Sequence, residues 1–461
     1  MPIRSPDEKD ADCRSSSRKP QESSGPPRTL VECLADPCAR VEREIWASVE
    51  SDASMLFITG PAGTGKSHVL RLLRDTLDEP PVVLAPTGIA ALGIGGQTIH
   101  SFFRLPKGIQ TAGDDGISRP TALYRAMSTL FLDELSMVRA DVMDRIDSIL
   151  RRAKDPNMPF GGVQIVAFGD LHQLAPVVTG EDRPILEKLG YSGPHFFESR
   201  IARQCPMRVF ALERIHRQRE QRFMRLLNAV RIGDVSSEML EFLNRRVFSE
   251  SLAGQAGALV LTTHRWRAEM RNEQYLQAIP GPERIYSGRI EGAFPGNQLP
   301  VSDRLALRPG ARIMFARNDR DGRWFNGSIG TVLECEAKRI VVELADGRGS
   351  FTVEPESWER FRYSFDKSTG CVERKVVARF TQIPVRLGWA ATIHRSQGLT
   401  LDQTHLDFSG GVFAAGQAYV ALSRCRTLGG LTLERPVRRS DLISDPRVIS
   451  FLESQLSRQA A

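Results

Sequence analysis

The sequence of 461 residues lacks any long apolar run. No stretch approaches the roughly 18 consecutive apolar residues that are typical of a membrane-spanning helix. This absence excludes a helical membrane protein, and we expect no membrane partner. At this length a single hydrophobic core is also excluded, and about two to four domains are expected.

Cysteine is scarce as well. The seven cysteines are odd in number and scattered, and Cys33 and Cys38 form the only close pair, with no second pair to complete a zinc site. We therefore expect reduced thiols in an intracellular protein rather than a disulfide framework. The net charge of +7 is compatible with a polyanionic partner, although charge alone does not require one.

Residues 1 to about 28 contain almost no apolar side chains, and we expect a disordered tail there. From residue 82 onward, short apolar runs alternate with longer helical patterns. The runs Val82–Leu84, Thr129–Leu132 and Val163–Phe168 are apolar or nearly so, which is typical of strands buried on both faces of a parallel sheet.

A second set of elements follows, with expected strands at Val209–Leu212 and Leu259–Thr262 around a helical stretch at about 220–248. Between about 309 and 382 the pattern changes to short strands separated by Gly, Asn and Asp. This predicts a small antiparallel β-barrel inserted into an α/β domain.

The clearest motif lies at residues 55–73, where an apolar run breaks into a glycine-rich turn and resumes with helical spacing. Gly60, Gly65, Lys66 and Ser67 fill the pattern G-x-x-x-x-G-K-[ST], in which main-chain N–H groups and a helix N-terminus bind phosphate. Lys66 is expected to reach the β- and γ-phosphates and Ser67 to ligate Mg²⁺. An ordinary glycine-rich turn is the alternative.

Asp133 and Glu134 end the apolar run Thr129–Leu132, at the sheet edge where ligands of open α/β sheets bind. Asp133 is expected to hold Mg²⁺, and Glu134 is expected to accept the proton of the attacking water. Gln173 follows the next strand and could sense the γ-phosphate. The alternative is a polar strand end on the surface.

Together these spacings resemble helicase superfamily one, and within it the PIF (petite integration frequency) DNA helicases. The resemblance covers roughly residues 50–435. It rests on matching stretches in the family's order, namely Gly60–Ser67, Ala85–Ala91 with Thr98–Phe103, Leu132–Met137, Pro159–Gln164 with Gly169–Leu174, Leu212–Gln218, and Ala391–Gly398 with Ala418–Arg424.

The resemblance implies an α/β fold with two RecA-like P-loop domains and a small inserted β-barrel of the Src-homology-three-like kind. The implied boundaries are a tail at 1–28, domain 1 at 29–203, domain 2 at 204–308 and 384–435, the insert at 309–383, and a C-terminal extension at 436–461. It also implies a 5′-to-3′ ATP-dependent DNA helicase with roles in DNA repair, recombination and telomere maintenance.

For the site, the resemblance implies ATP and Mg²⁺ as cofactors. Nucleotide binding would use Gly60, Pro61, Ala62, Gly63, Thr64, Gly65, Lys66 and Ser67, and the metal would use Ser67 and Asp133. The expected catalytic residues are Lys66, Glu134, Gln173, Arg217 and Arg424. Both arginines would reach the γ-phosphate across the cleft, because a guanidinium offers a charged, planar fork of donors. Surface ion pairs are the alternative for these two residues.

The expected DNA contacts are Thr87, Gly88, His100, Phe102, Thr263, His264, His394, Ser396, Gln397 and Gly398. Polar groups at strand ends would contact phosphates, and Phe102 would stack on a base. A buried hydrophobic pair is the alternative for Phe102, and a structural role in its turn is the alternative for His394. Residues 104–122 would carry a wedge that splits the duplex, with Leu105, Pro106 and Ile109 pressing on the terminal base pair.

One departure concerns the base, because Ala39–Glu44 contains no glutamine where the family has one that reads adenine. The expected partners are single-stranded DNA and duplex junctions, and we expect a monomer. The location would be the cytoplasm, at the nucleoid, in a bacterium and the nucleus in a eukaryote. A P-loop switch or kinase that is not a motor is the alternative function.

Overall fold

The computed structural model describes residues 40–50, 54–106, 108–110, 121–215, 217–218, 220–247, 258–292, 294, 299–365 and 372–460. The expected tail at 1–28 and the central part of the expected wedge at 111–120 lie outside the described residues. Within those ranges, every helix is too short or too polar to span a lipid bilayer.

The first α/β unit is built on a parallel sheet with the strand order β3-β2-β4-β5-β1-β6. Its strands are β1 (Met55–Thr59), β2 (Val82–Ala85), β3 (Gln97–Thr98), β4 (Thr129–Leu132), β5 (Gln164–Gly169) and β6 (Arg208–Ala211). Its helices are α2 (Arg40–Glu50), α3 (Lys66–Thr76), α4 (Gly88–Gly93), α5 (Ile99–Phe102), α6 (Thr121–Arg125), α7 (Ala140–Ala153), α8 (Asp182–Lys188) and α9 (Arg200–Gln204).

The apolar runs form this sheet because both of its faces are buried. Along β1, Met55 and Phe57 join one core cluster, whereas Leu56 and Ile58 join another. Successive side chains of a strand point to opposite faces, so a fully apolar run fills a core on each side. The parallel α/β class expected from the sequence is confirmed.

The strand β6 corrects one expectation. We assigned Val209–Leu212 to the second domain, but β6 pairs in parallel with β1, for example Leu56 with Arg208. It is therefore the edge strand of the first sheet. An apolar run of this length indicates a buried strand, but it carries no information about which strand is its neighbour.

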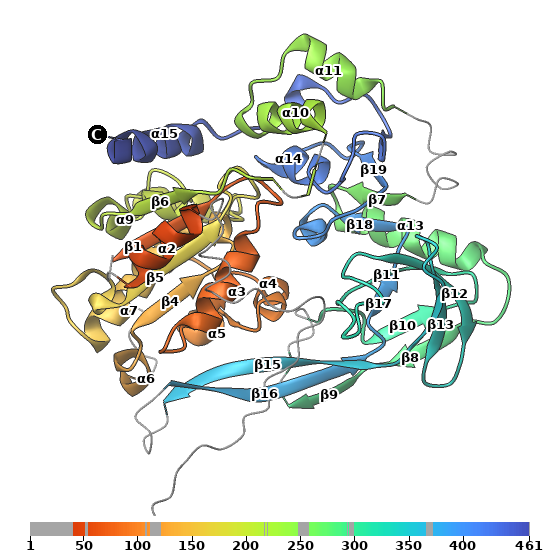
Figure 1. The fold of residues 1–461 in the computed structure, drawn as a ribbon, viewed down its shortest axis with the longest axis horizontal. Helices are drawn as coiled ribbons and strands as arrows, with labels where there is room; N and C mark the ends of the chain where they lie inside the picture. Colours follow the sequence, from red (N-terminus) through yellow and green to blue (C-terminus); the bar gives the residue numbers. More distant parts are fainter. Residues whose placement is uncertain are drawn as a thin grey trace, which may run out of the picture.

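The second α/β unit has a parallel sheet with the order β18-β7-β19-β20. Its strands are β7 (Leu259–Thr262), β18 (Ala390–Thr392), β19 (Thr404–Asp407) and β20 (Leu431–Leu433). The expected helical stretch is divided into α10 (Gln221–Ile232) and α11 (Ser237–Asn244), and α13 (Arg265–Ala278) and α14 (Gln417–Leu422) complete the unit. Figure 1 shows the two units beside each other, with α14 on the side facing the first unit.

The insert is antiparallel, as expected, but it starts earlier than residue 309. Its main sheet has the order β14-β13-β12-β11-β17, from β11 (Arg312–Phe315), β12 (Ile329–Cys335), β13 (Ile340–Leu344), β14 (Ser350–Val353) and β17 (Val385–Leu387). β8 (Arg284–Ser287) pairs with β10 (Arg304–Leu307), and β9 (Arg289–Gly292) pairs with β16 (Val372–Gln382). The antiparallel region therefore begins at about residue 284.

A long hairpin of β15 (Glu356–Phe365) and β16 extends from the insert to the first unit (Figure 1). β15 contacts α4, α6 and β3. At this contact the Arg360 Nη2 atom donates to Ser101 Oγ at 3.1 Å. The insert thus touches both α/β units.

The C-terminal helix α15 (Pro446–Ala460) returns from the second unit to the first, where it lies by β6 (Figure 1). The Phe451 ring stacks on Phe197 with centroids 4.3 Å apart. The His195 Nε2 and Asp445 Oδ2 atoms are 2.8 Å apart, and the two side chains are largely buried. The C-terminal extension is therefore a bridge back to the first unit.

Phe102 does not present its ring to a ligand. Its side chain is 3% exposed, and it packs against Phe103 and Tyr124 with ring centroids 4.8 Å and 5.7 Å away. The expected base-stacking role is therefore wrong for this conformation, and the buried-pair alternative holds. Phe103 is buried as well, and a pair of aromatic residues in the sequence does not reveal whether either ring faces solvent.

Because Phe102 is a core residue, Phe102→Ala should lower the free energy of unfolding by about 3–5 kcal/mol. Urea denaturation measures this loss. Ile89→Ala is the control, because Ile89 is 46% exposed and its truncation should cost less than about 0.5 kcal/mol. A variant of unchanged stability that binds single-stranded DNA more weakly would restore the stacking role.

Candidate nucleotide and DNA site

The glycine loop lies between β1 and α3. Gly63 and Gly65 have φ of 85° and 90°, which glycine adopts without the strain that a side chain would bring. No side chain caps α3, so its first N–H groups remain available to an anion. The strand-loop-helix context that we expected for this motif is present.

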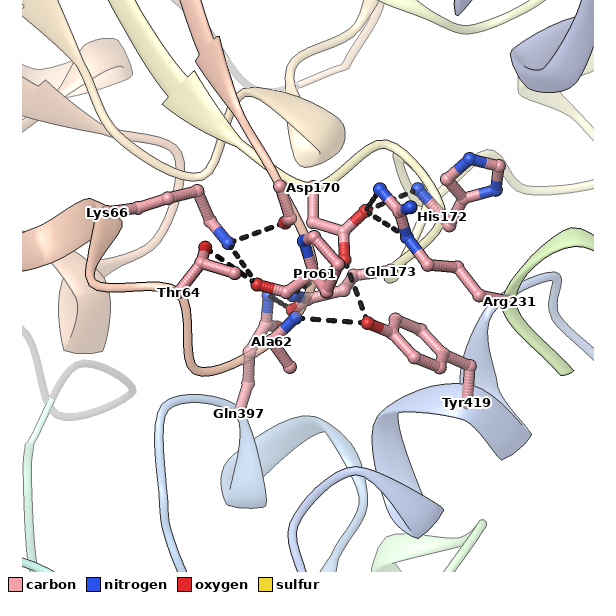
Figure 2. Close-up of polar contacts among 11 residues, drawn as sticks. Pro61, Ala62, Thr64, Lys66, Asp170, His172, Gln173, Arg231, Gln397 and Tyr419 are labelled. Atoms are coloured by element: carbon pink, nitrogen blue, oxygen red, sulfur yellow. Dashed lines mark hydrogen bonds and ion pairs between the residues drawn. The ribbon is translucent and has the colours of Figure 1, made fainter. Parts of the chain in front are cut away.

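Lys66 lies over the start of the loop. Its Nζ atom donates to the main-chain oxygens of Gly60 at 2.8 Å and of Pro61 at 3.0 Å (Figure 2). Burial lowers the pKa of Lys66, and the nearby carboxylates of Asp170 and Glu134 act against this. A buried ammonium group beside free N–H donors matches the charge of a polyphosphate.

Asp133 and Glu134 follow β4 directly, as the sequence predicted. Burial raises the pKa of Asp133, and burial together with the Asp133 charge raises the pKa of Glu134 to about 7. Two adjacent carboxylates withdrawn from water repel each other, and a divalent cation beside them would relieve this. Oxygen donors such as Asp133 and Ser67 suit Mg²⁺, so these residues fit the expected metal.

Glu134 is held in an unusual conformation. Its φ of 51° is in the left-handed region, which is uncommon for a residue with a side chain and costs about 1–3 kcal/mol. The Gln397 Nε2 atom of the second unit donates to Glu134 Oε2 at 2.9 Å. The main chain and a hydrogen bond from the other unit together orient this carboxylate.

Gln397 was expected to contact DNA. Instead its side-chain amide reaches Glu134 and lies 3.4 Å from Gln173 Oε1. Ser396 beside it is fully buried, and its hydroxyl donates to the Ile393 main-chain oxygen at 2.8 Å. In this conformation both side chains are committed within the protein, which contradicts the expectation of direct DNA contacts through them.

Both predicted arginines come from beyond the first sheet. Arg217 lies against the glycine loop, since a Cβ placed on Gly63 would come within 2.5 Å of the Arg217 Cβ. Its Nη1 atom donates to the Ser423 main-chain oxygen at 3.2 Å. Burial lowers the pKa of Arg217 to about 9, so this residue remains charged at neutral pH.

Arg424 is buried and bonded within the second unit. Its Nε atom donates to the Val420 main-chain oxygen, and its Nη2 atom donates to Ser423 Oγ, both at 2.9 Å. Burial lowers its pKa to about 10, and the Glu134 carboxylate acts in the opposite direction. In the contacts described, Arg217 and Arg424 donate to main-chain oxygens and to Ser423 and not to a surface carboxylate, so the alternative of surface ion pairs does not hold for them.

The remaining DNA candidates lie at element ends. Thr87 Oγ1 accepts from the Ala90 N–H and so caps α4, which begins at Gly88. His264 precedes α13, its Nδ1 atom is 2.8 Å from Thr263 Oγ1, and its ring is 5.4 Å from the exposed Phe413 ring. The others lie in α5 (His100), in the short 3₁₀ turn His394–Ser396 (His394) and two residues after that turn (Gly398).

Two of the three wedge candidates are packed inside. Leu105 belongs to the main core of the first unit, and Ile109 packs against a small cluster with Tyr191. Pro106 alone of the three is exposed in the described part. Leu105 and Ile109 therefore anchor the segment, which contradicts their assignment to the terminal base pair.

Sequence reasoning missed a group of polar residues behind the loop. Asp170 accepts hydrogen bonds from Arg231 and Tyr419, and Tyr419 also contacts the loop at Ala62, although the three residues come from the end of β5, from α10 and from α14 (Figure 2). Asp170 stands in the Gly169-Asp170 pair that the resemblance used, and Tyr419 stands next to Val420 in another such stretch. Their place in these stretches could have marked both residues as candidates for the site, but the spacing of the stretches did not indicate that the two side chains contact each other.

A phosphate-binding loop flanked by a second parallel α/β unit defines a two-unit P-loop NTPase. Residues 33–241 match the family described as PIF1-like helicase. The chain is 34% identical to the human ATP-dependent DNA helicase PIF1 over 422 residues, which are 86% of this chain and 60% of that protein. It is 32% identical to the Bdellovibrio bacteriovorus Pif1 over 416 residues, covering 86% of this chain and 87% of that one.

Solved structures of Pif1 helicases are similar to this chain as well. A Bacteroides Pif1 in complex with ADP-AlF4 has a TM-score of 0.84 at 34% identity, covering 91% of this chain and 97% of that one. The same protein bound to single-stranded DNA has a TM-score of 0.65 at the same identity and coverage. The chain belongs to the PIF1-like helicase family. It spans only 57% to 60% of the length of the vertebrate relatives it matches.

The site geometry predicts different failures for Lys66→Ala and Glu134→Gln. Losing Lys66 should weaken nucleotide binding as well as turnover, because a charge leaves the loop. Glu134→Gln should bind nucleotide normally but hydrolyse it about 10² to 10⁴ times more slowly, because an amide accepts no proton. Fluorescent-nucleotide binding and phosphate release measure the two effects.

The controls are Lys188→Ala and Glu187→Gln, which make the same changes at exposed positions of α8. Both should match the unmodified protein. Hydrolysis by Glu134→Gln at near the parental rate would mean that Glu134 is not the general base.

Proposed function

We propose that the protein is an ATP-dependent DNA helicase that moves 5′-to-3′ on single-stranded DNA and separates duplexes. The observation that carries the proposal is that groups from beyond the first sheet converge on the phosphate loop and on the carboxylate that follows β4. Arg217 backs onto Gly63, and Gln397 donates to Glu134. A hydrolysis site completed by a second unit can convert turnover into relative movement of the two units.

In this proposal the P-loop N–H groups and Lys66 bind the phosphates, and Ser67 and Asp133 hold Mg²⁺. Bound Mg²⁺ would supply positive charge to the phosphate oxygens. Glu134 accepts the proton of the attacking water, a role suited by a pKa of about 7. Gln173 contacts the γ-phosphate, and Arg217 and Arg424 stabilise charge on the transferred group.

DNA would cross both units at Thr87, Gly88 and His100 in the first and at Thr263, His264, His394 and Gly398 in the second. Gln397 lies directly before Gly398, and its amide is bonded to Glu134. We infer that DNA binding at this turn reorients Gln397 and so adjusts the catalytic carboxylate. This would make hydrolysis dependent on DNA.

We further propose that the antiparallel insert from β8 to β17 closes into a Src-homology-three-like barrel, and that the protein acts as an intracellular monomer. The lower TM-score to the DNA-bound relative supports a rearrangement of the parts on DNA, since the unliganded Bacteroides Pif1, at the same identity and coverage, has a TM-score of 0.83. A wedge role for residues 104–122 stays a prediction.

The decisive experiment compares ATP hydrolysis with and without single-stranded DNA, followed by strand displacement on duplexes with a 5′ or a 3′ tail. We expect strong stimulation by DNA and displacement with the 5′ tail. Hydrolysis indifferent to DNA would favour the alternative of a switch or kinase. Displacement from the 3′ tail alone would reverse the polarity.

Arg217→Ala should keep nucleotide binding and DNA binding but lower DNA-stimulated hydrolysis by about 10³-fold or more, because an arginine acting on the transferred group contributes about 10³ to 10⁵ in rate. Arg348→Ala is the matched control, since Arg348 is paired with Asp346 at an exposed position in the insert. Normal stimulated turnover of Arg217→Ala would remove Arg217 from the hydrolysis site.

A further inference from the structure

Asp170, at the end of β5, is a fully buried carboxylate that binds both α/β units. Its Oδ1 atom accepts from Arg231 Nη2 at 3.0 Å, and its Oδ2 atom accepts from the Tyr419 hydroxyl at 3.2 Å (Figure 2). Both donors belong to the second unit. The main-chain N–H of His172 and the Gln173 side chain, at 3.2 Å and 3.4 Å, complete its partners from the first unit.

The charge of Asp170 is secured by its neighbours. Burial alone would raise its pKa, but the Arg231 and Lys66 charges outweigh burial and hold the pKa below its ordinary value. An ionised carboxylate only accepts hydrogen bonds. The Tyr419 hydroxyl must therefore donate its proton to Asp170.

This fixes the other contact of the same hydroxyl. Because the Tyr419 hydroxyl points its hydrogen at Asp170, its oxygen accepts a hydrogen bond from the main-chain N–H of Ala62 at 3.0 Å. Ala62 lies in the phosphate loop, one residue before Gly63. The second unit thus supplies the hydrogen-bond partner of a loop N–H, and the direction of the bond is set by a buried ion pair.

The main chain just before Tyr419 also packs closely against the first unit. Gly416, the residue directly before α14, has a φ of 76°, and a Cβ placed on it would come within 2.4 Å of the main-chain oxygens of His172 and Gln173. Arg424 follows the same helix. Displacement of α14 would therefore act on Ala62, Gln173 and Arg424 together.

We propose that Tyr419 is a positioning residue: it sets the main chain of the phosphate loop at Ala62 and transmits the position of α14 to it, with its hydroxyl oriented by Asp170, which Arg231 keeps ionised. The proposal rests on the proposed ATP-driven function of the same site. Tyr419 touches the loop from behind. It acts on hydrolysis through the loop and not through the reacting atoms.

Tyr419→Phe removes only the hydroxyl and keeps the buried ring. We expect DNA-stimulated kcat to fall about tenfold, since hydrogen bonds to charged groups and to a loop N–H are lost together. KM for ATP should change less than about threefold, because Lys66 and the N–H groups from Gly63 onward are untouched. Steady-state hydrolysis with saturating single-stranded DNA separates the two constants.

Tyr286→Phe is the matched control, because Tyr286 is another buried tyrosine with a hydrogen-bonded hydroxyl, which donates to the main-chain oxygen of Glu336 at 2.8 Å, but it lies in the insert. Its kcat should be unchanged. Equal kcat for Tyr419→Phe and Tyr286→Phe would overturn the proposal, as would a rise in KM with unchanged kcat. Absence of DNA-stimulated hydrolysis in the unmodified protein would instead overturn the proposed function, and this inference with it.

Arg231→Lys separately tests whether Asp170 links Arg231 to Tyr419. Lysine keeps a positive charge beside Asp170 but lacks the planar fork of donors of arginine. If both side chains act through Asp170, the kcat loss in the double variant Tyr419→Phe/Arg231→Lys should be smaller than the product of the two single losses. Independent, multiplicative losses would contradict a shared path through Asp170.

Discussion

The site at the phosphate loop depends on a balance of charges that neither unit can provide alone. Asp133, Glu134 and Asp170 are withdrawn from water beside Lys66, and a carboxylate in such surroundings needs a cation or hydrogen-bond donors to stay ionised. For Asp170, these include the Arg231 guanidinium, which belongs to the other unit. The packing of the two units is therefore also the electrostatic completion of the site.

The same balance explains why the acidic groups behave differently. Asp170 has a guanidinium and a hydroxyl as partners, and its pKa is lowered. Glu134 accepts from the amide of Gln397, but burial and the adjacent charge of Asp133 raise its pKa to about 7. Of the two, the carboxylate with the higher proton affinity is the one suited to accept a proton.

Much of the frame was predictable from the sequence because its signals are local. The phosphate loop, the carboxylates after β4 and the apolar strands β1, β2, β4 and β5 of the first sheet follow from glycine spacing and from apolar runs. The sheet partner of β6, the burial of Phe102 and Ser396, and the contacts of Gln397 depend on packing between distant segments. Tyr419 and Ala62, which share one hydrogen bond, are 357 positions apart in the chain, and no spacing rule reaches that far.

The helix α15 attaches the end of the second unit back onto the first unit. The chain leaves the first unit after β6, builds the second unit, and is fastened again to the first through Phe451 on Phe197 and Asp445 on His195. Two units joined both by the chain after β6 and by the attachment of α15 can separate in fewer ways than two units joined by the chain alone. Relative movement of the two units is thereby limited to directions that leave both attachments intact.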